Sequence, residues 1–257
     1  MADTKISALT AASAAAGANE IPINEAGTTK KITVAQLEAF AFTSPVFAAG
    51  STSAGSAPKL TSGTVMTSAE AGAIEYTTNV PYFTPNTGNR AVLQCAHVAV
   101  VDSDKTGTNG TAVQNIFPAA FDTLTVEGST TYLWELFLDA DNGATTTTKA
   151  LAFDAGSCTY TSFRYWATSQ NVAINTTGTT QSSVHVNTAA VTVVLATGTT
   201  AWYIYAKGIM RVNAGGTFIP QFKYSADPTG TVLIRKDSYM TLTPLGTNTL
   251  ASVGAWA

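Results

Sequence analysis

The sequence predicts an all-β protein: a jelly-roll-like antiparallel sandwich preceded by a small N-terminal region of extended or helical structure. Short apolar or alternating runs follow one another from about Ala73 onward, separated by turn residues. Charged residues make up only 11% of the 257 residues, against roughly 25% in an average soluble protein. Threonine is abundant, and its β-branched side chain suits strands with polar but uncharged outer faces.

Residues 1–45 differ in composition from the rest of the chain and are predicted to anchor it to a partner. Small residues dominate from Ala11 to Ala18, so the region has too few large side chains for a core of its own. A strand-like run from Thr28 leads into a short predicted helix, Val34–Phe42, with Thr33 as its N-cap. The predicted anchoring residues are Ile6, Leu9, Ile21, Ile23, Ile32, Val34 and Leu37.

Residues 46–70 are predicted to be a linker or extended arm, and residues 71–257 the jelly-roll-like domain. The linker is rich in Gly, Ser, Thr and Ala and poor in charge and in large side chains. The predicted strands are Ile74–Thr77, Val80–Thr84, Ala91–Val101, Thr123–Val126, Thr131–Asp139, Ala150–Phe153, Thr159–Thr168, Ser183–Ala196, Trp202–Val212, Thr217–Tyr224, Val232–Arg235 and Tyr239–Thr243. The predicted turns are Asp102–Gly107, Asp139–Gly143, Asn175–Gly178, Asn213–Gly216 and Asp227–Gly230.

Two of these strands carry large side chains on both faces. In Trp202–Val212, every second residue from Trp202 is apolar or small and is predicted to face the core of the sandwich. The residues between them include two tyrosines on the opposite face, which is unusual for a solvent-exposed face in a chain with few charges. The strand Thr131–Asp139 is apolar in both phases as well. We expect a neighbouring subunit to cover the second face. The alternative is that the rings cover a loop of the same chain. The predicted interface residues are Leu133, Phe137, Tyr203, Tyr205 and Ile209.

The sequence shows no constellation of catalytic or metal-binding residues, so we expect no enzymatic activity, no cofactor and no metal. His97 and His185 lie in strand-like runs without an acidic or thiol companion at a useful spacing. The run Asp139–Gly143 resembles the start of a calcium loop, but no bidentate glutamate follows, and a hairpin turn is the better interpretation. Cys95 and Cys158 are predicted to be buried free thiols.

Charge and hydropathy exclude two classes of partner. No cluster of basic residues could neutralise a row of phosphates, so nucleic acid is not an expected partner. No apolar run is long enough to insert into a membrane, and the first residues lack the pattern of a signal peptide. We therefore expect synthesis in a cytoplasm.

Segments near both ends carry a resemblance to bacteriophage virion proteins. Asp3–Ala12, Glu20–Ile23 and Thr29–Leu37 resemble the N-terminus of phage tail-fibre and minor virion proteins, which docks such proteins onto the particle. Ile219–Gly230, Tyr239–Gly246 and Ser252–Trp256 are similar to the C-terminal heads of phage structural proteins with trimeric, tumour-necrosis-factor-like jelly rolls.

The resemblance implies a structural protein of the virion, assembled in the cytoplasm of the bacterial host. The first expectation is a homotrimeric short fibre on the virion surface, on tail or head. Its N-terminal region would contact other virion proteins, and its head would bind a host-surface glycan. The second is a capsid decoration protein that stabilises the shell and binds no receptor.

Overall fold

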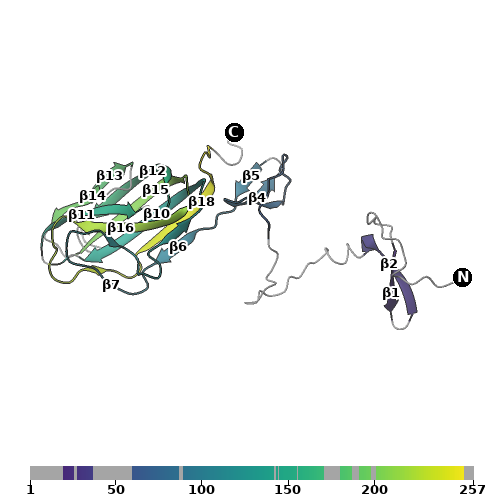
Figure 1. The fold of residues 1–257 in the computed structure, drawn as a ribbon, viewed down its shortest axis with the longest axis horizontal. Coiled ribbons are helices and arrows are strands. Elements are labelled where there is room, and N and C mark those ends of the chain that lie inside the picture. Colours follow the sequence, from purple (N-terminus) through teal and green to yellow (C-terminus); the bar gives the residue numbers. More distant parts are fainter. Residues whose placement is uncertain are drawn as a thin grey trace. The chain divides into compact units, whose positions relative to one another are not determined.

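The structure is a computed structural model that describes residues 20–25, 28–36, 60–86, 89–141, 143, 145–154, 156–170, 180–186, 191–197 and 201–251. The chain divides into two compact units, Met1–Lys59 and Leu60–Ala257. Nearly all of the regular secondary structure in the described part is β-strand, and the second unit contains two antiparallel sheets packed face to face (Figure 1). The predicted all-β, jelly-roll-like sandwich is therefore confirmed.

The first unit contains a β-hairpin followed by one helical turn. Strands β1 (Glu20–Glu25) and β2 (Thr28–Thr33) pair antiparallel, with Ile21 opposite Ile32. The backbone N–H of Gln36 donates to Thr33 Oγ1 (3.2 Å), and the N–H of Thr33 donates to Gln36 Oε1 (2.9 Å). This reciprocal capping box confirms Thr33 as the predicted N-cap. The described helical residues are 34–36, and the rest of the predicted helix lies outside the described residues.

The sandwich is built from an eight-stranded and a five-stranded sheet. In the larger sheet the order runs β13-β12-β15-β10, after which β18 and β17 share the other edge of β10 and pair with β6 and β7 respectively. Its strands are β6 (His97–Val100), β7 (Lys105–Thr106), β10 (Thr130–Asp141), β12 (Tyr160–Gln170), β13 (Thr180–His185), β15 (Ala201–Val212), β17 (Leu233–Ile234) and β18 (Tyr239–Thr247).

The smaller sheet has the order β14-β11-β16, and β8 and β9 both pair with the free edge of β16. Its strands are β8 (Gln114–Asn115), β9 (Leu124–Val126), β11 (Thr147–Asp154), β14 (Val191–Thr197) and β16 (Gly216–Tyr224). Consecutive strands switch repeatedly between the two sheets, as in a jelly roll. The sandwich therefore depends on pairing between segments distant in sequence.

The core lies between the sheets and is dominated by aromatic rings. Trp134 on β10 is fully buried, and its ring centroid lies 5.1 Å from Phe153 and 5.5 Å from Tyr165. On β15 the predicted core phase is confirmed, since the side chains of Trp202 and Met210 are both fully buried. The alternation of buried and half-buried residues along β10 and β15 fixes one face of each strand inward.

Gly208 sits in the middle of β15, where the core has no room for a side chain. It pairs with Trp134 on one side and Tyr165 on the other. A Cβ at Gly208 would lie 2.8 Å from Trp134 Cζ2 and 2.6 Å from Tyr165 Cβ, and would also strike the carbonyl oxygen of Arg164.

We expect Gly208→Ala to lower the free energy of unfolding by about 1–3 kcal/mol, the usual cost of overpacking a core. Equilibrium denaturation at fixed chain concentration measures this. Asn213→Ala, at an exposed turn position after the same strand, serves as the control. Equal stability of Gly208→Ala and the unaltered chain would contradict the described packing of Trp134.

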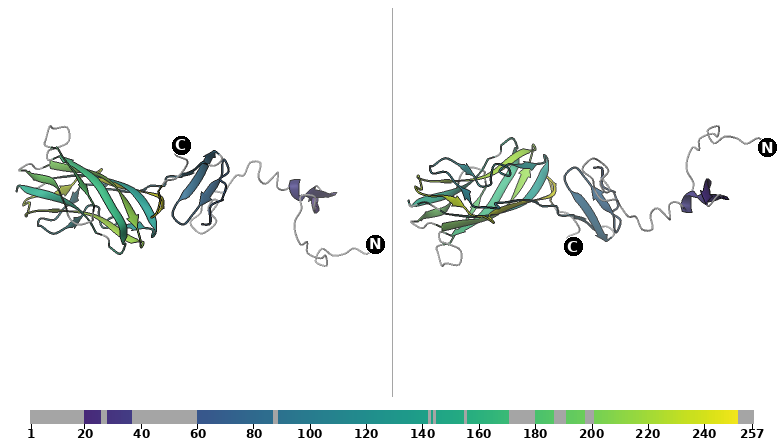
Figure 2. Two further views of the ribbon diagram at one scale, coloured as in Figure 1. Left: turned by 90° about the horizontal axis from the view of Figure 1, so that it is seen from above. Right: turned by 90° about the horizontal axis from the view of Figure 1, so that it is seen from below.

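A separate small sheet precedes the sandwich (Figure 2). It consists of β3 (Ile74–Tyr76), β4 (Pro81–Asn86) and β5 (Asn89–Val92). The side chain of Asn79 ties it to the loop before β10, because its Nδ2 donates to Thr130 Oγ1 (2.6 Å) and to the Ser129 carbonyl (3.4 Å). Val80 beside it is fully buried. The first strands of the predicted head thus form a sheet of their own.

Several sequence predictions are corrected here. The predicted strand Ala91–Val101 is two strands, β5 and β6, in different sheets, and Ser183–Ala196 is likewise divided between β13 and β14. The predicted turn Asp139–Gly143 begins too early, because pairing with β17 extends β10 to Asp141. Both cysteines are free, as predicted, but Cys95 is exposed and only Cys158 is buried. An apolar run does not reveal where a strand leaves its sheet.

Candidate functional site

The outward side of the eight-stranded sheet, which we call the outer face, holds all five predicted interface residues. Leu133 lies directly opposite Ile209, and Phe137 lies opposite Tyr205, across the β10–β15 pair. Tyr203 is two residues before Tyr205 on β15 and shares its face. Ile209 is 44% exposed, whereas the other four are half-buried. The structure therefore gathers these residues into one continuous patch on two adjacent strands.

The patch extends to residues that the sequence analysis missed. Trp166 on β12 lies opposite Lys207, and Val184 on β13 lies opposite Trp166. On the far side, Val98 and Val100 on β6 lie opposite outward-facing residues of β18. These four side chains are 41%, 73%, 60% and 42% exposed, respectively. Alternation within each strand could have marked them, but their gathering depends on pairing between distant segments.

The outer side of the five-stranded sheet has a different character. Its outward residues on β11 and β16 include Ala150 opposite Lys223 and Ala152 opposite Gln221. These side chains are small or polar, and the two alanines are buried, at 7% and 4% exposed. The two sides of the sandwich are therefore unlike, and large apolar side chains concentrate on the outer face of the larger sheet.

The tyrosine hydroxyls of the outer face bond within the face. Tyr239 Oη donates to Glu135 Oε1 at 2.7 Å, and the Tyr203 hydroxyl donates to Gln170 Oε1. The bond from Tyr239 lowers the pKa of Glu135, and the same bond raises the pKa of Tyr239 to about 12. Burial, followed by a hydrogen bond with Glu135, raises the pKa of Tyr205. Since these polar groups already have partners, covering the rings leaves few of them unsatisfied.

The outer face also carries charged residues of both signs. Arg164, Lys207 and Arg211 line a depression of about 360 Å³ that also includes Val184 and Ile209. Arg211 donates to the carbonyls of residues 248 (2.7 Å) and 250 (2.9 Å), and Lys207 lies 3.9 Å from the Glu135 carboxylate. Arg164 is exposed and makes no hydrogen bond or ion pair with any described residue. Its positive charge is available to a partner.

Comparisons with known proteins identify no family. No family model matches the chain, and no curated protein matches it. Among solved structures, a chain in "Structure of infectious bursal disease virus Gx strain" is similar over 72% of this chain and 49% of that chain, with 9% identity and a TM-score of 0.17. The match spans about half of that viral chain.

Four of the predicted anchoring residues lie among the described residues of the first unit. Ile21 and Ile32 face each other across the hairpin, and Ile21 is 40% exposed. Ile23 is in β1, and Val34 opens the helical turn. Ile6, Leu9 and Leu37 lie outside the described residues. The hairpin therefore presents at least one exposed isoleucine next to a second one.

The two histidines singled out in the sequence lie apart from each other, whereas two of the turn aspartates share one arginine. His97 is exposed on β6, whereas His185 packs against Tyr165 (4.8 Å between ring centroids), and burial lowers its pKa. The carboxylate of Asp141 pairs with Arg235, which also contacts Asp104 at 2.9 Å. Within the described ranges, no three His, Cys, Asp or Glu residues are grouped so that they could hold a metal ion. No helix among these residues could span a membrane.

Proposed function

We propose that this chain is a structural component of a bacteriophage particle: a homotrimeric short fibre on the virion surface, on tail or head, without enzymatic activity. The observation that carries the proposal is the contrast between the two sides of the sandwich. Among the described side chains, the outward residues of β11 and β16 are mostly small or polar, whereas the larger sheet gathers Phe137, Trp166 and Ile209 with neighbouring valines and tyrosines. Interface cores are enriched in aromatic residues in this way.

A second copy of the chain is the occupant that fits the outer face best. Basic residues on β12 and β15 lie beside the acidic residues Glu135 and Asp139 on β10. Lys207 and Arg211 already have partners within the chain, so a symmetric contact can set Arg164 of one copy against an acidic residue of the next. Either a dimer or a trimer satisfies this pairing. The number three comes from the resemblance of Ile219–Gly230 and Tyr239–Gly246 to trimeric phage heads.

The N-terminal unit is proposed to attach the trimer to other virion proteins. It is a compact unit separate from the head, and its described hairpin carries the exposed Ile21. Its sequence supports this role through the resemblance of Asp3–Ala12 and Thr29–Leu37 to the docking segments of phage virion proteins. In this proposal the head binds a host-surface glycan. The alternative proposal is a decoration protein that stabilises the capsid and binds no receptor.

Electron cryo-microscopy of the phage particle tests this proposal. We expect three-fold density for the head on the virion surface, attached through residues 1–45, and loss of that density when those residues are deleted. Density on the tail would exclude the decoration role, and density over the shell lattice would favour it. Particles that never contain the chain would contradict both.

A further inference from the structure

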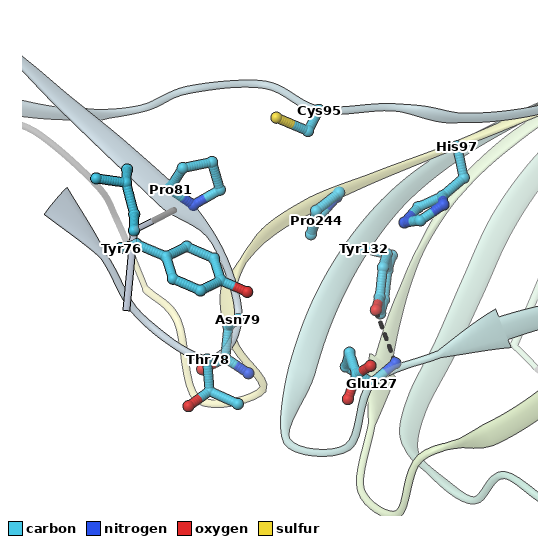
Figure 3. Close-up of a pocket in the computed structure, with 10 residues that line it drawn as sticks. Tyr76, Thr78, Asn79, Pro81, Cys95, His97, Glu127, Tyr132 and Pro244 are labelled. Carbon is cyan, nitrogen blue, oxygen red and sulfur yellow. Dashed lines mark hydrogen bonds between the residues drawn. The ribbon is translucent and has the colours of Figure 1, made fainter. Parts of the chain in front are cut away.

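A cleft of about 410 Å³ lies between the small sheet and the adjacent end of the sandwich (Figure 3). Tyr76 and Pro81 form the wall on the small sheet, and His97, Glu127 and Pro244 lie on the wall of the sandwich. Its size falls within the range of small-molecule sites. None of the residues that line it belongs to the proposed subunit contact.

Hydrogen bonds hold the floor of the cleft in place. Asn79 lines the cleft and donates to Thr130 Oγ1 at 2.6 Å, which joins the two walls. On the sandwich side, the backbone N–H of Glu127 donates to Tyr132 Oη at 2.8 Å. On the other side, Thr78 Oγ1 bonds to Ser62 Oγ at 3.1 Å. The cleft is therefore formed before any ligand arrives, which reduces the entropic cost of binding.

Three polar groups around the cleft remain free. The Tyr76 hydroxyl, the His97 ring and the Glu127 carboxylate make no hydrogen bond with any described residue. Together they supply donors and an acceptor, and the Tyr76 ring, in a residue 37% exposed, offers an apolar surface. No lysine or arginine is among the residues that line the cleft, and Glu127 is the acidic one.

These groups match the chemistry of an uncharged sugar. A pyranose ring has an apolar C–H face that can stack on an aromatic side chain and a rim of hydroxyls that both donate and accept hydrogen bonds. A phosphate, sulfate or uronate would meet the carboxylate of Glu127 without a compensating cation. The lining therefore favours neutral saccharides over acidic ones.

We propose that the cleft between the small sheet and the sandwich binds a neutral saccharide, with Tyr76 stacking on the sugar ring and His97 and Glu127 bonding its hydroxyls. This inference rests on the glycan-binding part of the proposed function and assigns it to a place and a class of ligand. A symmetric oligomer would carry one cleft per chain, so weak individual sites would act together on a polysaccharide surface.

The test measures binding of the full-length oligomer to immobilised neutral oligosaccharides of glucose, galactose and mannose, beside oligosaccharides that contain uronic acids. We expect binding to at least one neutral series and weaker binding to the acidic ones. Tyr76→Ala should weaken that binding about tenfold, the equivalent of about 1.4 kcal/mol. Phe121→Ala, which removes a 56% exposed ring outside the cleft, should bind as the unaltered chain does.

A second variant tests the selection against acidic sugars. Glu127→Gln keeps the size of the side chain and removes its charge, so we expect binding of the acidic oligosaccharides to rise several-fold. The affinity of this variant for the neutral oligosaccharides should change less. Thermal unfolding of each variant verifies that the head remains folded.

The outcomes separate the site from the broader function. If Tyr76→Ala binds neutral oligosaccharides as tightly as the unaltered chain, the assignment of the site to this cleft is wrong, although the protein still binds glycans. Preference for acidic sugars in the unaltered chain would overturn the ligand class. No saccharide binding at all would overturn this inference together with the glycan part of the proposed function, while the oligomer and its place on the virion are tested by separate measurements.

Discussion

Ile209→Asp is expected to dissociate the oligomer while the head stays folded. Ile209 is 44% exposed on the outer face, so the change removes no core packing from the single chain. In the proposed assembly, however, the new carboxylate would be buried between subunits. Arg164 lies directly opposite Ile209, so the new carboxylate would be buried as an ion pair, and its desolvation still costs several kcal/mol per ion while the apolar contact of Ile209 is lost. Light scattering at micromolar chain concentration should show monomers.

Val113→Asp is the matched control for this prediction. Val113 is also β-branched and 48% exposed, and it precedes β8 outside the outer face. This variant should assemble as the unaltered chain does. Tyr205→Asp should behave like Ile209→Asp, because it places a second carboxylate next to Glu135, with which Tyr205 makes a hydrogen bond. An Ile209→Asp protein that remains fully assembled would contradict the proposed interface.

Lys149→Met is expected to stabilise the protein at neutral pH. Lys149 points into the core from β11 and is 0% exposed. Its ammonium makes one hydrogen bond within the described part of the chain, to the carbonyl of Thr147 at 2.9 Å. Burial lowers its pKa from 10.5 to about 8, a penalty of about 3 kcal/mol at roughly 1.4 kcal/mol per unit. Methionine fills a similar volume without a charge, so we expect a gain of about 2 kcal/mol.

The same lysine predicts how stability depends on pH. Between about pH 8 and 10.5 the folded protein has released this proton and the unfolded chain still holds it. Because the unfolded state binds more protons in that window, this group makes the free energy of unfolding rise with pH. Below pH 8 both states are protonated and its contribution is constant.

Chemical denaturation at pH 7 and at pH 9.5, at fixed chain concentration, measures both effects. Lys149→Met should be more stable at pH 7 and should lose the rise toward pH 9.5. Lys223→Met makes the same substitution on the outward side of β16, opposite Ala150, and should change neither quantity much. A less stable Lys149→Met protein would indicate that the buried ammonium has a favourable role.

Alternation within single strands was the part of this fold that the sequence could predict. Because side chains alternate with a period of two residues along a strand, the sequence predicted which residues of β15, from Trp202 to Val212, face the core. The same alternation identified the second face of β10. The turns after residues 212 and 226 followed from their Gly, Asn and Asp content. The N-cap at Thr33 was likewise local, since it depends on Thr33 and Gln36 alone.

Features that depend on distant pairing could not be predicted. β18 pairs with β10, and β6 pairs with the other edge of β18, so nothing local placed Val98 beside the strand that contains Tyr239. The division of Ser183–Ala196 between two sheets has the same origin. The cleft was missed because its walls, at Tyr76 and Glu127, are joined by a contact between Asn79 and Thr130. The five interface candidates could be proposed from the sequence because each lies on β10 or β15 in the alternate position to the core residues, a pattern with a period of two.

The mass of the full-length protein in solution tests the central claim most directly. The outer face is proposed to be covered by further copies of the chain, so light scattering at micromolar concentration should give three times the 26.6 kDa of one chain. A mass of 26.6 kDa that persists as concentration rises would mean that Phe137, Tyr205 and Ile209 face water, which would contradict the proposed assembly.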